Sequence, residues 1–140
     1  MSDHNIYQTP SAYGYPLLIK QLLNTLELRN PDQEIVYADR LRYTYRDFKK
    51  RVAQLANLLT SLGVREGDTV AVLDWDSHRY LECFFAIPMI GAVLHTVNIR
   101  LSADQILYTM NHAGDDLVLI NEEFLPLMTP ILGRIETVKD

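Results

Sequence analysis

Cysteine and clustered glycine are scarce in this sequence of 140 residues. Cys83 is the only cysteine, so a single chain can build neither a disulfide framework nor a cysteine-based metal site. The glycines never lie closer than four residues apart, which leaves no loop of the kind that cradles phosphates. The histidines show none of the short spacings typical of metal ligands. We therefore predict no metal site formed by this chain alone.

Long apolar runs and an excess of basic charge are also absent. The longest apolar run, residues 83–94, contains Pro88 and is shorter than the ~18 residues that indicate a transmembrane segment. The net charge is -5, and without a basic face a nucleic-acid partner loses its main source of affinity. The first residues lack the basic segment of a secretory signal, which favours a cytoplasmic location.

The amino-terminal third predicts an arm, a helix and a hairpin. Residues 1–15 are polar and aperiodic, and we expect an extended arm there. Pro16 suits the first turn of a helix, and Leu18, Leu22 and Leu26 recur every four residues, which predicts a short amphipathic helix. Residues 34–38 and 41–44 are rich in β-forming residues and predict a hairpin around Asp39 and Arg40.

The rest of the chain predicts alternating helices and strands. Thr44 followed by Asp47 is a capping box for a helix that ends at Gly63. Strands are predicted at 69–73, 92–96 and 116–120, helices at 77–90, 102–112 and 122–132, and the start of a strand at 136–138. Strands separated by single helices form parallel neighbours. Residues 16–140 thus predict an α/β segment, part of a doubly wound parallel sheet.

Ligands of such sheets bind beyond the carboxyl ends of the strands. The first strand is followed by Trp75, Asp76, Ser77 and His78, which include residue types of acid–base sites, but neighbours in sequence do not form a triad. Capping of the next helix by Asp76 or Ser77 is the favoured interpretation.

The other two strand ends carry further polar residues. His95, Asn98 and Arg100 follow the second strand; they can face a ligand, or brace a turn and pair with a surface acid. Residues 121–123 after the third strand are typical of an acidic first helical turn. We predict no catalytic residue in this chain, and contact with substrate or another subunit by Trp75, Asp76, His95, Asn98 and Arg100.

A set of ordered positions resembles a known family. The resemblance to the N-terminal region of AMP-forming acyl-CoA synthetases is carried by Thr44-Tyr45, Asp47, Val52, Leu55-Ala56, Leu62-Gly63-Val64, Gly67-Asp68, Val70-Ala71-Val72, Ala86, Gly91-Ala92-Val93 and Asn98. The chain resembles the medium- and long-chain fatty-acyl-CoA ligase branch in particular, through the run Leu94 to Leu101, with Gln105, Tyr108 and Asn111-His112-Ala113. One departure is Asp76, where family members often have Asn.

The resemblance implies an enzyme that converts a fatty acid, ATP and coenzyme A to acyl-CoA, AMP and diphosphate, with magnesium. It also implies that the phosphate-binding loop, the adenine and ribose motifs and the lysine of the mobile C-terminal domain lie beyond residue 140. This chain alone is then expected to bind no cofactor and to be inactive, with the remainder of the synthetase as its partner.

Two alternatives from other classes stay open. The tyrosine-bearing arm and the lack of a site fit a self-standing binding or dimerisation module, whose partner would include a second copy of the chain. Asp74 and Asp76 at a strand end fit a receiver-like signalling domain, but the hairpin at residues 34–44 does not suit that fold, which needs an acidic pair after its first strand.

Overall fold

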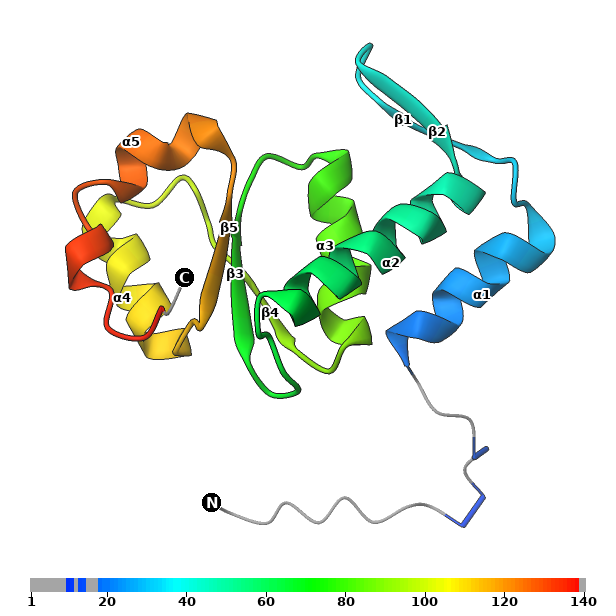
Figure 1. Cartoon of the computed structure of the whole chain (residues 1–140), viewed down its shortest axis with the longest axis horizontal. Helices are drawn as coiled ribbons and strands as arrows, with labels where there is room; N and C mark the ends of the chain where they lie inside the picture. The colour runs from blue at the N-terminus through cyan, green and yellow to red at the C-terminus, as the bar shows by residue number, and fades with distance from the viewer. Residues whose placement is uncertain (1–9, 12, 15–17, 139–140) are drawn as a thin grey trace.

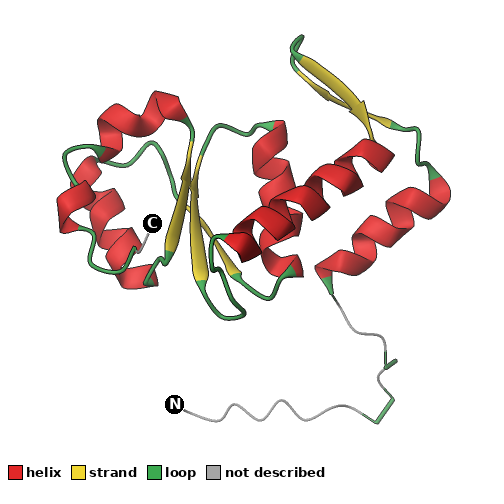
Figure 2. Ribbon diagram, in the orientation of Figure 1, coloured by secondary structure: helices red, strands yellow, loops and turns green. Residues whose placement is uncertain are grey.

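The computed structural model describes residues 10–11, 13–14 and 18–138. Most of the predicted arm at 1–15 and the predicted helix start at Pro16 lie outside the described residues. Figures 1 and 2 show a small parallel sheet with helices on both faces, flanked by a helix and a hairpin from the amino-terminal part of the chain. Among the described residues, no helix has the length and apolar character that a membrane crossing requires.

The first helix, α1 (Ile19–Arg29), packs on α2 and α3 through a different face from the predicted one. Leu23 is buried and Leu26 is half-buried in the contact, whereas Leu18 and Leu22 are 47% and 58% exposed. The buried stripe follows the three-residue spacing from Leu23 to Leu26, so the face predicted from Leu18 and Leu22 is wrong. Both spacings fit one face of a helix, and only packing decides between them.

The predicted hairpin is confirmed. Strands β1 (Glu34–Tyr37) and β2 (Leu41–Thr44) pair antiparallel, with Tyr37 opposite Leu41. The connection spans residues 38–40, and Ala38 takes a left-handed conformation at φ 47°.

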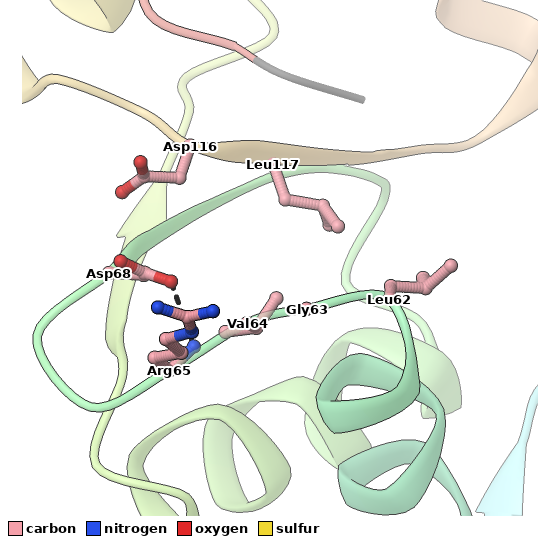
Figure 3. A pocket seen from close by; sticks show the side chains of 7 residues that line it. All are labelled: Leu62, Gly63, Val64, Arg65, Asp68, Asp116 and Leu117. Carbon is pink, nitrogen blue, oxygen red and sulfur yellow. Dashed lines mark hydrogen bonds between the residues drawn. The ribbon is translucent and has the colours of Figure 1, made fainter.

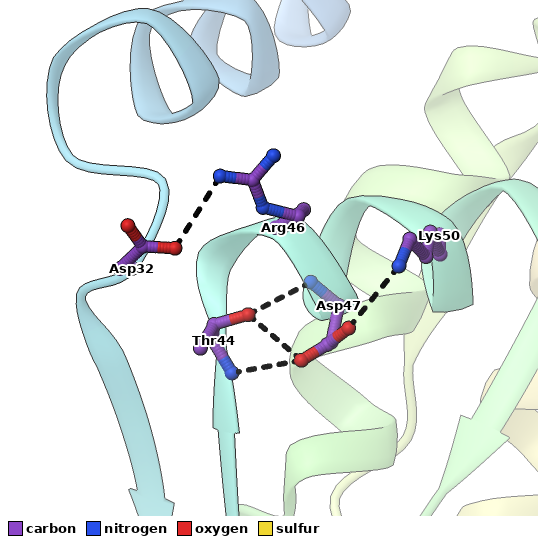
Figure 4. A network of polar contacts seen from close by, with 5 residues as sticks. All are labelled: Asp32, Thr44, Arg46, Asp47 and Lys50. Carbon is purple, nitrogen blue, oxygen red and sulfur yellow. Dashed lines mark hydrogen bonds and ion pairs between the residues drawn. The ribbon is translucent and has the colours of Figure 1, made fainter.

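The capping box at the start of α2 (Tyr45–Ser61) is also confirmed. The Thr44 hydroxyl accepts from the Asp47 backbone N–H, and the Asp47 carboxylate accepts from the Thr44 backbone N–H and hydroxyl (Figure 4). These hydrogen bonds lower the pKa of Asp47. Lys50 forms an ion pair with Asp47. The Arg46–Asp32 ion pair joins this turn to the segment before β1. The helix therefore starts at a point fixed by its own sequence.

The sheet has three parallel strands in the order β4-β3-β5. They are β3 (Thr69–Leu73), β4 (Val93–Thr96) and β5 (Leu117–Ile120), and the connecting helices are α3 (His78–Met89) and α4 (Ala103–Ala113). In the central strand β3, Val70 and Val72 join the apolar cluster under α2 and α3, while Ala71 and Leu73 join the cluster under α4. This two-sided burial explains its continuous apolar sequence and confirms the doubly wound α/β class.

The carboxyl-terminal segment differs from the prediction. Instead of one helix over 122–132, the chain forms η1 (Glu122–Phe124), α5 (Leu125–Met128) and η2 (Leu132–Arg134). Pro126 is tolerated in the first turn of α5, but Pro130 has no backbone N–H and cannot continue a helix. The strand predicted at 136–138 is wrong, because bends occupy 136–137. There the Thr137 hydroxyl donates to the Asp115 backbone carbonyl at 2.8 Å.

Candidate functional site

The crevice between the carboxyl ends of β3 and β5 is the candidate site. After β3 the chain turns to the face covered by α2 and α3, and after β5 it turns to the face covered by α4 and α5 (Figure 1). Neighbouring parallel strands that send their chains to opposite faces open a crevice at this edge, where ligands of doubly wound sheets bind.

Asp74, the first residue after β3, joins the two sides of this crevice. Its carboxylate accepts from the Asn121 side-chain amide at 2.7 Å and from the Ser77 hydroxyl. It also accepts from the backbone N–H of Trp75 at 2.8 Å. Asn121 is the first residue after β5, so the contact connects two strand ends that are 47 residues apart in sequence.

Trp75 forms a second connection across the same crevice. The Trp75 indole N–H donates to the Glu123 carboxylate at 2.8 Å, and its ring lies 4.9 Å from that of Phe124. The residue nevertheless remains 45% exposed. The loops after β3 and β5 are thus joined by one polar pair and one aromatic pair.

A pocket of 280 Å³ lies under this edge, between the sheet and α2 and α3. One wall carries an ion pair in which the Arg51 Nε donates to the buried Glu82 carboxylate at 2.6 Å. The Tyr43 hydroxyl donates to the same carboxylate at 3.4 Å, and burial, with the charge of Glu82, raises the pKa of Tyr43 to about 12. Burial likewise raises the pKa of Cys83 to about 12, so its thiol stays protonated and unreactive at neutral pH.

The Ser77 and His78 side chains do not form a catalytic pair. Ser77 caps α3 by accepting from the Tyr80 backbone N–H at 3.2 Å, as the capping interpretation predicted. The His78 ring lies 5.2 Å from that of Tyr37, against the hairpin, and burial lowers the pKa of His78. The Ser77 hydroxyl donates to Asp74, and His78 faces the hairpin instead.

His95 lies on β4 and contacts a residue that the sequence analysis missed. Its Nδ1 lies 2.9 Å from both carboxylate oxygens of Asp115, which is completely buried just before β5. Burial raises the pKa of Asp115, and the contact with His95 opposes that shift. An acidic residue directly before a predicted buried strand was the available signal, but nothing in the sequence pairs it with His95.

Asn98 and Arg100 lie in the turn after β4. The Asn98 side-chain oxygen accepts from the Arg100 backbone N–H at 3.0 Å, and both residues are exposed. Asn98 therefore braces a turn, as the structural interpretation expected. Asp76 is exposed next to Trp75. Of the five predicted contact residues, the structure brings Trp75 to the loop after β5, whereas Asp76 lines a pocket beside the hairpin. Contact with a substrate or subunit stays a prediction for all five.

The opposite edge of the sheet holds a pocket of 330 Å³ with a different lining (Figure 3). Asp68 accepts from the backbone N–H of Arg65 at 2.8 Å, and Asp116 accepts from that of Thr69 at 3.0 Å. Asp68 closes the turn that leads into β3, and Asp116 joins the start of β5 to the start of β3. No cluster of three or more metal-ligating side chains is found in the described part of the chain.

The fold is that of a doubly wound α/β protein with a candidate ligand site at the carboxyl ends of its strands. The comparisons with known proteins identify the family. Residues 26–139 match the family of AMP-binding enzymes, and the chain belongs to that family. The N-terminal domain of FACL13 from Mycobacterium tuberculosis superposes with a TM-score of 0.82 at 25% identity over 88% of this chain and 32% of that one. An anthranilate CoA ligase in complex with anthranoyl-AMP superposes with a TM-score of 0.83 at 25% identity, over 89% of this chain and 25% of that one.

Two curated relatives within this family are fatty-acid–CoA ligases. A long-chain-fatty-acid–CoA ligase from Thermus thermophilus is 45% identical over 98 residues, which is 70% of this chain and 18% of the ligase. A medium-chain-fatty-acid–CoA ligase from Ectopseudomonas oleovorans is 37% identical over 98 residues, with the same coverage. The chain thus spans less than a fifth of the length of these two relatives, and the resemblance noted in the sequence is confirmed.

Proposed function

We propose that this chain is the amino-terminal part of the large domain of a fatty-acyl-CoA synthetase, which converts a fatty acid, ATP and coenzyme A to acyl-CoA, AMP and diphosphate. The observation that carries the proposal is the 45% identity to a long-chain-fatty-acid–CoA ligase over 98 residues. The relatives' names supply the substrate class, and the parallel sheet with its open carboxyl edge supplies a suitable framework.

The role proposed for this chain is structural. Its left-handed glycines at 63, 67, 91 and 114 belong to separate turns, so the described residues do not fit the phosphates of ATP. We assign ATP, magnesium and coenzyme A to the remainder of the synthetase, in a cytoplasmic enzyme. This chain contributes the crevice wall formed by Asp74, Asn121 and Trp75, and the exposed residues Asp76, Asn98 and Arg100 contact the substrate or the remainder of the enzyme.

A segment exchange tests this proposal. Residues 18–138 replace the matching segment of the Thermus thermophilus ligase, and acyl-CoA formation is measured with a long-chain fatty acid. We expect acyl-CoA from the exchanged enzyme and no ATP–pyrophosphate exchange by the 140-residue chain alone. An exchanged enzyme that folds, shown by circular dichroism and a sharp thermal transition, yet forms no acyl-CoA would overturn the proposal.

A self-standing dimerisation module is the second candidate. The observation that favours it is the exposed apolar face of α1, where Ile19 is 40% exposed and Leu22 58% exposed. Light scattering of the 140-residue chain separates the two functions. A dimer that Leu22→Glu converts to a monomer supports the module, and a monomer at every concentration counts against it.

A further inference from the structure

Three hydrogen bonds converge on one carboxylate at the crevice. Asp74 accepts from the side chain of Asn121, from the hydroxyl of Ser77 and from the backbone of Trp75. The three donors belong to the loop after β5, to the cap of α3 and to the loop after β3. One side chain therefore sets the spacing of two strand ends and the start of a helix.

We propose that Asp74 is a positioning residue that holds the Trp75 indole in a fixed place beside the carboxyl ends of β3 and β5, where the acyl chain of the substrate lies against its exposed face. Asp74 fixes the backbone of Trp75, and Glu123 fixes the indole N–H. Phe124 contacts the ring, while Trp75 remains 45% exposed. The acyl-chain assignment rests on the proposed function.

The chemistry of the exposed indole selects an apolar group. Its only hydrogen-bond donor is already bound to Glu123, so the open part of the ring offers apolar area and no polar partner. An immobilised aromatic surface gains affinity because no side-chain freedom is lost on binding. If the connection between Asp74 and Asn121 is broken, the ring keeps its area and loses its fixed place.

Asn121→Asp in the 140-residue chain tests the positioning role. The variant keeps the shape of the side chain but places a second carboxylate against Asp74, and like charges at this distance repel until they share a proton. Trp75 is the only tryptophan, so its fluorescence reports on the crevice. We expect its emission to shift to longer wavelength at neutral pH and to return toward that of the parent chain as the pH falls.

The exchange of both residues gives a partial rescue. In Asp74→Asn/Asn121→Asp, the amide at 74 donates to the carboxylate at 121 and its oxygen still accepts from Ser77, but the Trp75 N–H loses its acceptor because it shares the Asp74 oxygen that Asn121 binds. The repulsion between two carboxylates is removed, so the emission should return part of the way to that of the parent chain at neutral pH. Asp104→Asn is the matched control, because Asp104 is exposed and pairs with Arg134 on the surface. Emission of Asn121→Asp that equals that of the parent chain at every pH overturns the positioning role.

The acyl-chain part is read in the exchanged ligase. We expect Asp74→Ala and Trp75→Ala to raise KM for a long-chain fatty acid about fivefold to tenfold, the loss expected for one aromatic contact, with kcat and the KM for ATP nearly unchanged. An unchanged fatty-acid KM in both variants overturns the acyl-chain assignment. If the exchanged ligase forms no acyl-CoA at all, the proposed function fails, and the fluorescence measurements still decide the role of Asp74.

Discussion

The two edges of the parallel sheet satisfy their polar groups in different ways. At the amino edge, Asp68 and Asp116 accept from the backbone N–H groups of Arg65 and Thr69. At the carboxyl edge, Asp74 and Asn121 bond through their side chains, as do Trp75 and Glu123. The bonds of Asp68 and Asp116 go to the backbone, whereas the carboxyl edge adds contacts between side chains of separate loops to the backbone contact of Asp74 with Trp75.

This difference separates folding from function. A carboxylate that accepts from a backbone N–H holds the backbone in place, so its removal destabilises the backbone conformation. A pair of side chains between loops can change with little effect on the chain path, which suits an edge where ligands bind. Substitutions at the amino edge should therefore lower stability and leave the crevice unchanged, and substitutions at the carboxyl edge should alter the crevice.

The largest effect is expected for Asp115→Ala. Asp115 is completely buried before β5 and contacts His95 through both carboxylate oxygens, so its removal leaves the half-buried imidazole without its partner. We expect a loss of about 3 kcal/mol in the free energy of unfolding, measured by urea denaturation. Unchanged stability would show that the pair adds nothing to the fold.

Gly91→Ala should have the next largest effect. Gly91 precedes β4 with φ at 82°, and its carbonyl accepts from the Gly67 N–H. An added Cβ would lie 2.9 Å from the Glu66 Cγ. Because Glu66 can move but the left-handed backbone remains unfavourable, we expect a loss of about 1–2 kcal/mol. Gly133→Ala is the control, since its Cβ meets nothing within 4 Å.

Asp116→Ala tests a bond between a side chain and the backbone at the amino edge. The variant leaves the Thr69 N–H, at the start of β3, without its carboxylate acceptor. We expect a loss of about 1 kcal/mol with no change in Trp75 fluorescence, measured on the same denaturation samples. A shift in the emission would break the separation of the two edges.

Trp75→Phe should have the smallest effect on stability. The phenyl ring keeps the contact with Phe124 and loses the hydrogen bond to Glu123. Because Trp75 is 45% exposed, we expect the free energy of unfolding to fall by less than about 1 kcal/mol. A loss as large as that of Asp115→Ala would give the carboxyl edge a structural role equal to that of the amino edge.

Most elements predicted from local signals were found, but the single helix at 122–132 and the strand at 136–138 were not. The contacts between distant residues were not predicted. The capping box at Thr44 is encoded by a few neighbouring residues. The buried face of α1 and the partner of His95 depend on which elements meet. Pro126 and Pro130 lie inside the helix predicted at 122–132, and the sequence thus contained a signal against one continuous helix.

For the candidate site too, local features were predicted and contacts between distant residues were not. The strand ends were predicted, because a continuous apolar run marks a buried strand. The importance of Asp74 was missed because its partners come from 47 residues away and from the backbone.

The most direct test of the separation between the two edges compares one substitution from each in the exchanged ligase. For Asp116→Ala and Asp74→Ala, the melting temperature and the KM for a long-chain fatty acid are measured side by side. The account predicts that Asp116→Ala lowers the melting temperature and leaves KM unchanged, and that Asp74→Ala raises KM by more than its loss of stability accounts for. A KM that rises equally in both variants, in proportion to lost stability, would contradict it.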